Sequence, residues 1–162
     1  MSVTSVQKDP EKLTMTITAE YGVSVERAWE LWSDPRQLER WWGPPTYPAT
    51  VVEHNLVPGG TITYFMTGPE GDTPGGMWNV LEVEAPTRLV VEDAFVDDAG
   101  NPMEDMPRTV MQVHLAERPG GGVIMSIESK FPSLEAMQQL TEMGMDEGMK
   151  LAMGQIDGIL AG

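Results

Sequence analysis

Two histidines are the side chains most suited to acid–base chemistry near neutral pH, because imidazole has the ordinary pKa closest to 7. His54 directly follows Glu53 in a stretch with the pattern of a strand, where neighbouring residues point to opposite faces. His114 is out of phase with the apolar residues Val113 and Leu115, so we expect it to face solvent. We therefore expect structural or surface roles for both histidines and predict no catalytic residue.

Other catalytic and metal-binding patterns are missing from the sequence. The chain has no cysteine, which excludes disulfides, thiolate metal sites and cysteine nucleophiles. No His, Asp and Glu spacing matches a metal motif, and neither a GxSxG elbow nor a phosphate-binding loop occurs. The acidic pair Asp146-Glu147 stands at the expected start of a helix, where the helix dipole favours negative charge. We expect no metal and no cofactor.

Tryptophan and methionine are unusually frequent, with five and thirteen copies. Trp29, Trp32, Trp41 and Trp42 fall in two short predicted helices, and Trp78 begins a predicted strand. Core packing is the first interpretation of these rings. Trp41 and Trp42 are adjacent and should not both face inward from a helix, so we expect one of them at the rim of a cavity. An indole there offers apolar area and a hydrogen-bond donor to a ligand.

A methionine stripe marks one face of the last predicted helix. Met145, Met149 and Met153 recur every four residues, and a thioether either fills core gaps or moulds around apolar ligands. Gly148 and Ala152 add little bulk beside them, so this helix should fill space unevenly. We therefore predict a cavity between the helix and a curved sheet. The candidate ligand-binding residues are Trp41, Trp42, Tyr64, Trp78, Met111, Met125, Met149 and Met153. Tyr64 would supply the polar contact that orients a mainly apolar ligand.

The elements that must position these residues follow from periodicity and turn residues. Apolar residues alternate with threonine from Leu13 to Tyr21, which predicts a strand. Ser24 and Asp34-Pro35 are the expected starts of two short helices. Six more strands are expected at 50–56, 61–67, 77–83, 89–95, 110–116 and 123–131. A short helix then follows Ser133 and runs into a longer one over residues 145–160. The order predicts an α+β fold with seven antiparallel strands and the long C-terminal helix across one face.

Length and charge narrow the function further. The 162 residues suit one domain, which we place at residues 12–162 after a polar lead-in at 1–11. Ten Lys and Arg oppose 25 Asp and Glu, and the net charge of −15 repels nucleic acids and anionic membranes. No apolar run approaches the ~20 residues that span a bilayer, and no signal peptide is evident. We expect a cytoplasmic protein.

Several motifs together resemble one family. They are Trp32-Ser33-Asp34-Pro35, Leu38, Arg40-Trp41-Trp42-Gly43-Pro44, Pro58-Gly59-Gly60, Arg88-Leu89-Val90, Phe131-Pro132-Ser133 and Gly144-Met145 with Gly148. The chain is similar, from about Leu13 to its end, to the bacterial activator-of-heat-shock-protein-90-ATPase homologues. These belong to the START-like, birch-allergen-like (SRPBCC) superfamily. The resemblance implies the helix-grip fold, in which a bent seven-stranded sheet wraps the C-terminal helix and often leaves an apolar cavity. The family often has tryptophan at the position of Met149.

Three classes of function stay open on this basis. The first is binding of a small apolar molecule without catalysis. The second is a cyclase-like or dehydratase-like enzyme, as the superfamily includes such proteins. The third is a module that contacts a chaperone, as the family name implies, and a homodimer is a further partner to consider. Fold alone does not separate these classes.

Overall fold

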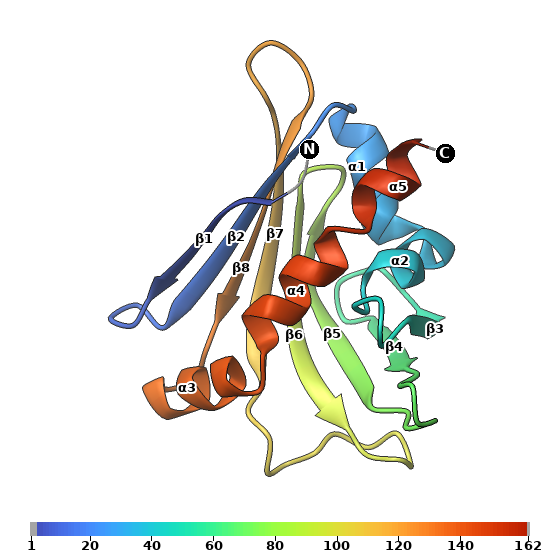
Figure 1. The fold of residues 1–162 in the computed structure, drawn as a ribbon, viewed down its shortest axis with the longest axis vertical. Coiled ribbons are helices and arrows are strands. Elements are labelled where there is room, and N and C mark those ends of the chain that lie inside the picture. Colours follow the sequence, from blue (N-terminus) through green and yellow to red (C-terminus); the bar gives the residue numbers. More distant parts are fainter. Residues whose placement is uncertain (1–2, 162) are drawn as a thin grey trace.

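The computed structural model describes residues 3–161 as one antiparallel sheet with helices on one face (Figure 1). The eight strands lie in the order β1-β2-β8-β7-β6-β5-β4-β3. Their bounds are β1 Val3–Asp9, β2 Thr14–Tyr21, β3 Ala49–His54, β4 Thr61–Met66, β5 Gly75–Glu84, β6 Arg88–Val96, β7 Thr109–Glu117 and β8 Val123–Lys130. The helices are α1 Val25–Ser33, α2 Pro35–Trp41, α3 Leu134–Glu142, α4 Met145–Met153 and α5 Ile156–Ala161.

Local sequence explains where the first two helices begin. The Ser24 hydroxyl accepts a hydrogen bond from the Arg27 backbone N–H at 3.1 Å, which caps α1. The Asp34 carboxylate accepts one from the Arg36 N–H at 2.9 Å, and Pro35 takes the first position of α2. The two helices predicted between the first pair of core strands are therefore confirmed, with the predicted capping residues.

The expected count of seven strands was wrong, because β1 lies inside the segment that was expected to be a polar lead-in. β1 pairs antiparallel with β2, and a register shift between Val3 and Ser5 marks a bulge. The bulge lets Val3 and Val6 both pack against the core although they are three residues apart. An edge strand with a bulge and mostly polar residues shows no period of two, so the sequence pattern concealed it.

The prediction of one continuous C-terminal helix over residues 145–160 was also wrong. This segment is divided into α4 and α5 at Gly154 and Gln155. Gly154 is a weak helix former, and the Gln155 side-chain amide donates a 2.6 Å hydrogen bond to the Gly43 carbonyl after α2. The break therefore ties the C-terminal helices to the end of α2.

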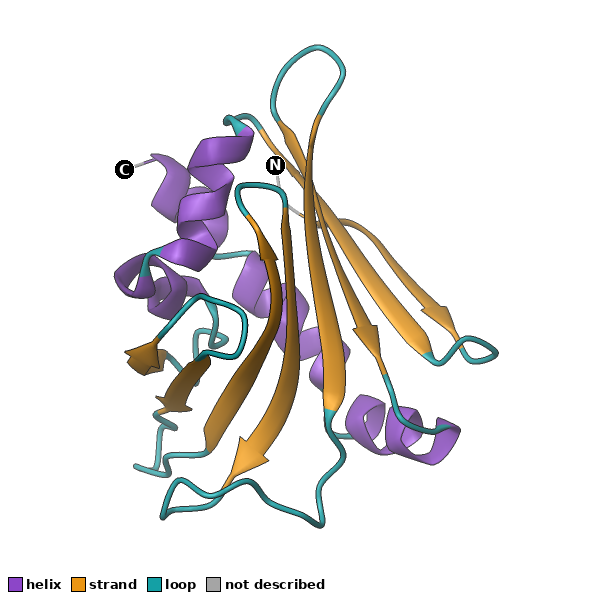
Figure 2. Cartoon of the chain, turned by 180° about the vertical axis from the view of Figure 1, so that it is seen from behind, coloured by secondary structure: helices purple, strands orange, loops and turns teal. Residues whose placement is uncertain are grey.

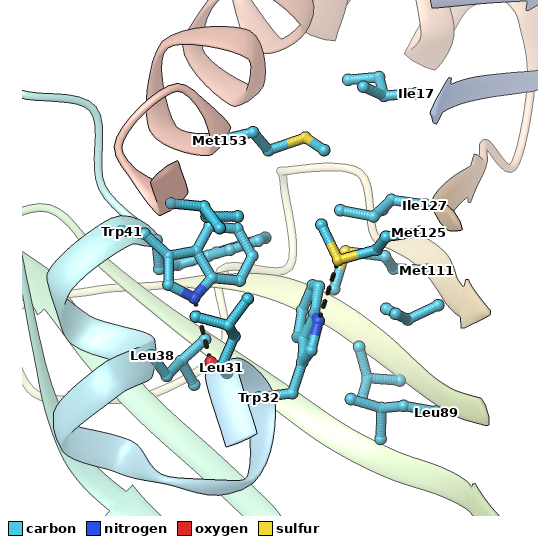
Figure 3. Packing of buried hydrophobic residues seen from close by; sticks show 14 of the residues in the cluster. Ile17, Leu31, Trp32, Leu38, Trp41, Leu89, Met111, Met125, Ile127 and Met153 are labelled. Carbon is cyan, nitrogen blue, oxygen red and sulfur yellow. Dashed lines mark hydrogen bonds between the residues drawn. The ribbon is translucent and has the colours of Figure 1, made fainter. Parts of the chain in front are cut away.

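The helices and the sheet enclose one core. α4 crosses the face of the strands in Figure 1, whereas Figure 2 shows the opposite face of the sheet without a covering helix. Leu38 of α2, Ile127 of β8 and Met153 of α4 all belong to the buried cluster between these layers, and Figure 3 shows the Trp32 and Trp41 rings between them. Within residues 3–161, no helix combines the length and apolar character needed to cross a bilayer.

Candidate functional site

A cavity of about 240 Å³ lies between the sheet and the helices α3 and α4. An apolar cavity of about 150 Å³ is large enough to bind benzene, so this volume suits a ligand of one or two rings. Most of its lining is apolar or aromatic. The lining residues are Trp41, Trp42, Pro44, Tyr64, Met66, Asp93, Phe95, Pro107, Thr109, Met111, Ser129, Leu140, Met143, Gly144, Met145, Gly148, Met149, Ala152 and Met153.

The structure brings six of the eight candidate binding residues together around this cavity. They are Trp41, Trp42, Tyr64, Met111, Met149 and Met153. Trp78 and Met125 do not line it, and both are fully buried. The Trp78 ring packs edge-on against Trp42 with centroids 4.8 Å apart. The Met125 sulfur accepts a hydrogen bond from the Trp32 indole N–H at 3.4 Å (Figure 3). Trp78 and Met125 therefore lie in the core beneath the cavity lining and pack on Trp42 and Trp32.

Trp41 and Trp42 are both buried, contrary to the expectation that one would sit at a rim. Trp42 caps the end of α2 with helical backbone angles, and its backbone N–H donates to the Leu38 carbonyl at 3.0 Å. Both rings are covered because each packs on the Trp32 ring, with centroids 4.8 Å and 6.2 Å away. The Trp41 indole N–H donates to the Leu31 carbonyl at 3.0 Å (Figure 3). The Trp42 indole N–H is buried without a hydrogen-bond partner in the described residues.

Small residues of α4 lie beside the cavity, as the sequence predicted for Gly148 and Ala152. Gly144 begins α4 with a φ of 88°, a left-handed conformation that favours glycine. A Cβ atom added at Gly148 would meet no heavy atom within 4 Å outside the local helix backbone. Gly148 and Ala152 line the cavity next to Met149, so small side chains on this helix account for part of the unfilled volume.

Asp93 is the acidic residue among the lining residues that the sequence prediction missed; the others include Met66, Phe95, Thr109 and Ser129. In β6, Leu89 and Val91 are buried in the core, and Phe95 lines the cavity. Asp93 has the same parity and therefore points to the same face of the sheet. The period of two could therefore have placed Asp93 on the inner face of the sheet. With 25 acidic side chains in the sequence, a single acidic residue in an apolar row does not stand out by type alone.

Burial changes the acid–base properties of this part of the cavity. The Tyr64 hydroxyl donates a long hydrogen bond of 3.5 Å to Asp93 Oδ1. Burial raises the pKa of Asp93 to about 7, although the Tyr64 hydroxyl and the Trp78 indole N–H oppose part of the rise. Burial, followed by the charge of Asp93, raises the pKa of Tyr64 well above its ordinary value. The indole N–H groups of Trp42 and Trp78 lower it in part, although neither has a partner of good hydrogen-bond geometry. Near neutral pH, the Asp93 carboxyl group in the cavity is therefore present in both its protonated and its ionised form.

The histidines lie away from the cavity. His114 is exposed, and one ring nitrogen of His54 lies 2.9 Å from the Trp32 carbonyl oxygen. Neither lines the cavity. Across residues 3–161, no group of three or more His, Asp and Glu side chains could hold a metal ion.

The single curved antiparallel sheet, the helices on one face and the cavity between them define an α+β protein of the START-like type. Residues 22–161 match the family described as activator of Hsp90 ATPase homolog 1-like protein, and the chain belongs to this family. No curated protein matches the sequence significantly.

Solved structures agree with this assignment. The crystal structure of Ms6760 from Mycobacterium smegmatis is 44% identical, with a TM-score of 0.90 over 98% of this chain and 96% of that chain. A solution structure of an Arthrobacter aurescens protein is 46% identical, with a TM-score of 0.94 over 99% of this chain and 92% of that chain. DynU16, from the dynemicin biosynthetic locus, shares the fold alone: it is 18% identical, with a TM-score of 0.59 over 86% of this chain and 46% of that chain.

Proposed function

We propose that this protein binds a small, mainly apolar molecule in the cavity between the sheet and α4. The observation that carries the proposal is the cavity itself, which is bordered by a helix with small residues at Gly148 and Ala152 and by methionine and tryptophan side chains. A packed core normally leaves few voids larger than a water molecule. A hollow of about 240 Å³ with an apolar lining is the kind of feature that accepts a small ligand, and it supports the proposal.

Filling the cavity tests this proposal. Met149→Trp is expected to abolish binding of N-phenyl-1-naphthylamine, a neutral dye that fluoresces in apolar sites, because the indole would occupy the space of the ligand. The measurement is a fluorescence titration, with circular dichroism to verify the fold. Leu151→Trp is the matched control: residue 151 is in the same helix, is 57% exposed and does not line the cavity, so dye binding should persist. A wild-type protein that never binds the dye would contradict the proposal, especially if Met149→Trp also lost about 1–3 kcal/mol of stability through overpacking.

Gly148→Ala separates stability from binding at one position. Because a Cβ fits at this helical site, the substitution is expected to raise the free energy of unfolding by about 0.5–1 kcal/mol. The methyl group would also occupy part of the cavity and weaken dye binding. Gly158→Ala is the control, since Gly158 lies in α5 with equal room for a Cβ but does not line the cavity. Urea denaturation and dye titration of both variants provide the comparison; equal dye affinity in the two would show that the space at Gly148 is not used for binding.

An enzyme of the cyclase or dehydratase type is the second candidate function. One observation favours it: Asp93 lines the cavity with a pKa near 7, where a carboxyl group can both give and take a proton. Native mass spectrometry of protein purified without denaturation should detect a retained apolar molecule in either case. Conversion of that molecule during incubation would favour the enzyme, whereas release without change would favour a binding protein. A direct, saturable complex with a purified chaperone, without a retained molecule, would instead support the chaperone-contact class.

A further inference from the structure

One side of the cavity is polar although the rest is apolar. Asp93 and Thr109 face each other across β6 and β7, and both line the cavity. The Tyr64 hydroxyl lies 3.5 Å from Asp93 Oδ1, and the Trp42 ring packs on Tyr64 with centroids 6.1 Å apart. A ligand that was apolar throughout would leave these groups unmatched, and unmatched buried polar groups are costly.

The hydrogen-bond donors and acceptors on this polar side of the cavity determine which ligand group can bind there. The Trp42 indole N–H is buried without an acceptor in the described residues, and indole nitrogen can only donate. Tyr64 already donates to Asp93, and a neutral carboxyl group has one O–H to donate. No lysine or arginine of residues 3–161 lines the cavity, so a ligand anion would find no countercharge. The hydroxyl groups of Thr109 and Ser129, which also line the cavity, can either donate or accept. The Trp42 N–H and the O–H of a neutral Asp93 can only donate, so these two groups call for an acceptor on the ligand.

We infer that the ligand is a neutral apolar molecule bearing a carbonyl oxygen, which accepts hydrogen bonds from the Asp93 carboxyl group and the Trp42 indole N–H. Tyr64 positions Asp93 by donating to Oδ1. The inference rests on the proposed function and deepens it, because it names the functional group by which the cavity recognises its ligand. A tyrosine beside a neutral aspartic acid in an apolar site is an arrangement that can bind a carbonyl or developing oxyanion, as in ketosteroid isomerase.

The donor role of Asp93 makes recognition depend on pH. The carboxyl group can donate only while it is protonated, so the carbonyl contact is present below a pH of about 7 and is lost above it. Tyr64 is the other titratable side chain of the lining within the described residues, and its raised pKa keeps it neutral in this range. Trp78 and Thr109, opposite Asp93 on β5 and β7, do not titrate. The charged residues of α4 do not line the cavity; they are Asp146, Glu147 and Lys150.

Two probes of equal size test the inference. 2-Acetylnaphthalene carries a carbonyl oxygen where 2-isopropenylnaphthalene carries a terminal CH2 group, and each is titrated by displacement of the dye or by ligand-observed NMR. At pH 6 we expect Asp93→Leu to reduce the ratio of ketone to hydrocarbon affinity at least tenfold relative to wild type. Asp93→Asn keeps a donor and should preserve the ratio from pH 6 to 8. In the wild type, the ratio should fall as the pH rises through about 7. Glu92→Leu, the neighbouring acidic position on β6 that does not line the cavity, should leave the ratio unchanged.

The outcomes separate this inference from the proposed function. If neither naphthalene derivative binds the wild type, the cavity does not bind small apolar molecules and both fail. If both bind but the ratio is the same in Asp93→Leu and at pH 6 and 8, the cavity binds ligands and the carbonyl contact is wrong. Stronger binding of the cationic analogue 1-(2-naphthyl)ethylamine than of the ketone would also overturn it, since ionised Asp93 would then be the partner of a ligand cation. If Asp93→Leu does not fold, the pH profile of the wild type decides.

Discussion

Replacement of Trp32 by alanine is expected to lower the free energy of unfolding by about 3–5 kcal/mol, the range typical of large aromatic residues in cores. Trp32 has no exposed surface, and its ring meets Trp41 edge-on with centroids 4.8 Å apart and Trp78 at 6.0 Å. Its N–H donates to the Met125 sulfur of β8. The residue therefore joins α1 to the cavity wall and to the far half of the sheet, and its loss would leave a large void among rigid rings.

The measurement is urea denaturation followed by far-ultraviolet circular dichroism, because the substitution changes tryptophan fluorescence. Trp32→Phe provides the control: it keeps an aromatic ring and should lose clearly less stability than Trp32→Ala. Trp29→Ala is a second comparison, since Trp29 is also buried in α1 but lies outside the ring contacts of Trp32. Near-wild-type stability of Trp32→Ala would show that the cluster contributes little to the fold.

Stability should also fall with rising pH through the contribution of Asp93. Its pKa is about 7 in the folded protein against an ordinary value of 3.8, so between these values the folded protein holds a proton that the unfolded chain has released. The stabilisation is complete below about pH 4, declines across the window and is lost above about pH 7. For one proton the slope is at most about 1.4 kcal/mol per pH unit, or on the order of 4 kcal/mol in total.

Asp93→Asn isolates this contribution from the many other acidic groups. The amide is neutral at every pH and similar in size, so the variant should gain stability relative to wild type as the pH rises from 5 to 7, and the difference should then stay constant. Unfolding curves from pH 5 to 8 remain above the isoelectric point near 4.3. Parallel pH profiles for the two proteins would mean that Asp93 is solvated and titrates normally.

The elements that the sequence predicted correctly are those in which apolar residues recur at a regular spacing. β2 shows buried residues at every second position from Met15 to Tyr21, and the predicted strand there needed no further information. β1 could not be found in the same way, because its bulge breaks the period and its pairing, not its own burial, makes it a strand. The break at Gly154 likewise depends on a distant partner, the Gly43 carbonyl, that spacing along the chain does not reveal.

The site was predictable to the extent that it follows from helix spacing and residue size. Met149 and Met153 share a helix face, and both line the cavity. Met125 could not be distinguished from Met111 by sequence, because both point inward from adjacent strands and only the position of the Trp32 ring hides Met125. Asp93 shows the opposite limit: its position on the inner face followed from its spacing in the strand, but its raised pKa follows from burial, with Tyr64 and Trp78 opposing part of the rise, and only the tertiary structure reveals these surroundings.

The strand order of the sheet has a consequence for folding during synthesis. From β4 to β8 each strand pairs with the one before it, but β2 finds its second neighbour only in β8, where Thr14 pairs with Lys130. An isolated hairpin such as β1–β2 is marginally stable in water. The first hairpin of the nascent chain must therefore await the last strand, and contacts of such long sequence separation slow folding. Because β8 is among the last segments to be synthesised, the edge of β2 stays open to incorrect pairing, or to protection by a chaperone, for most of that time.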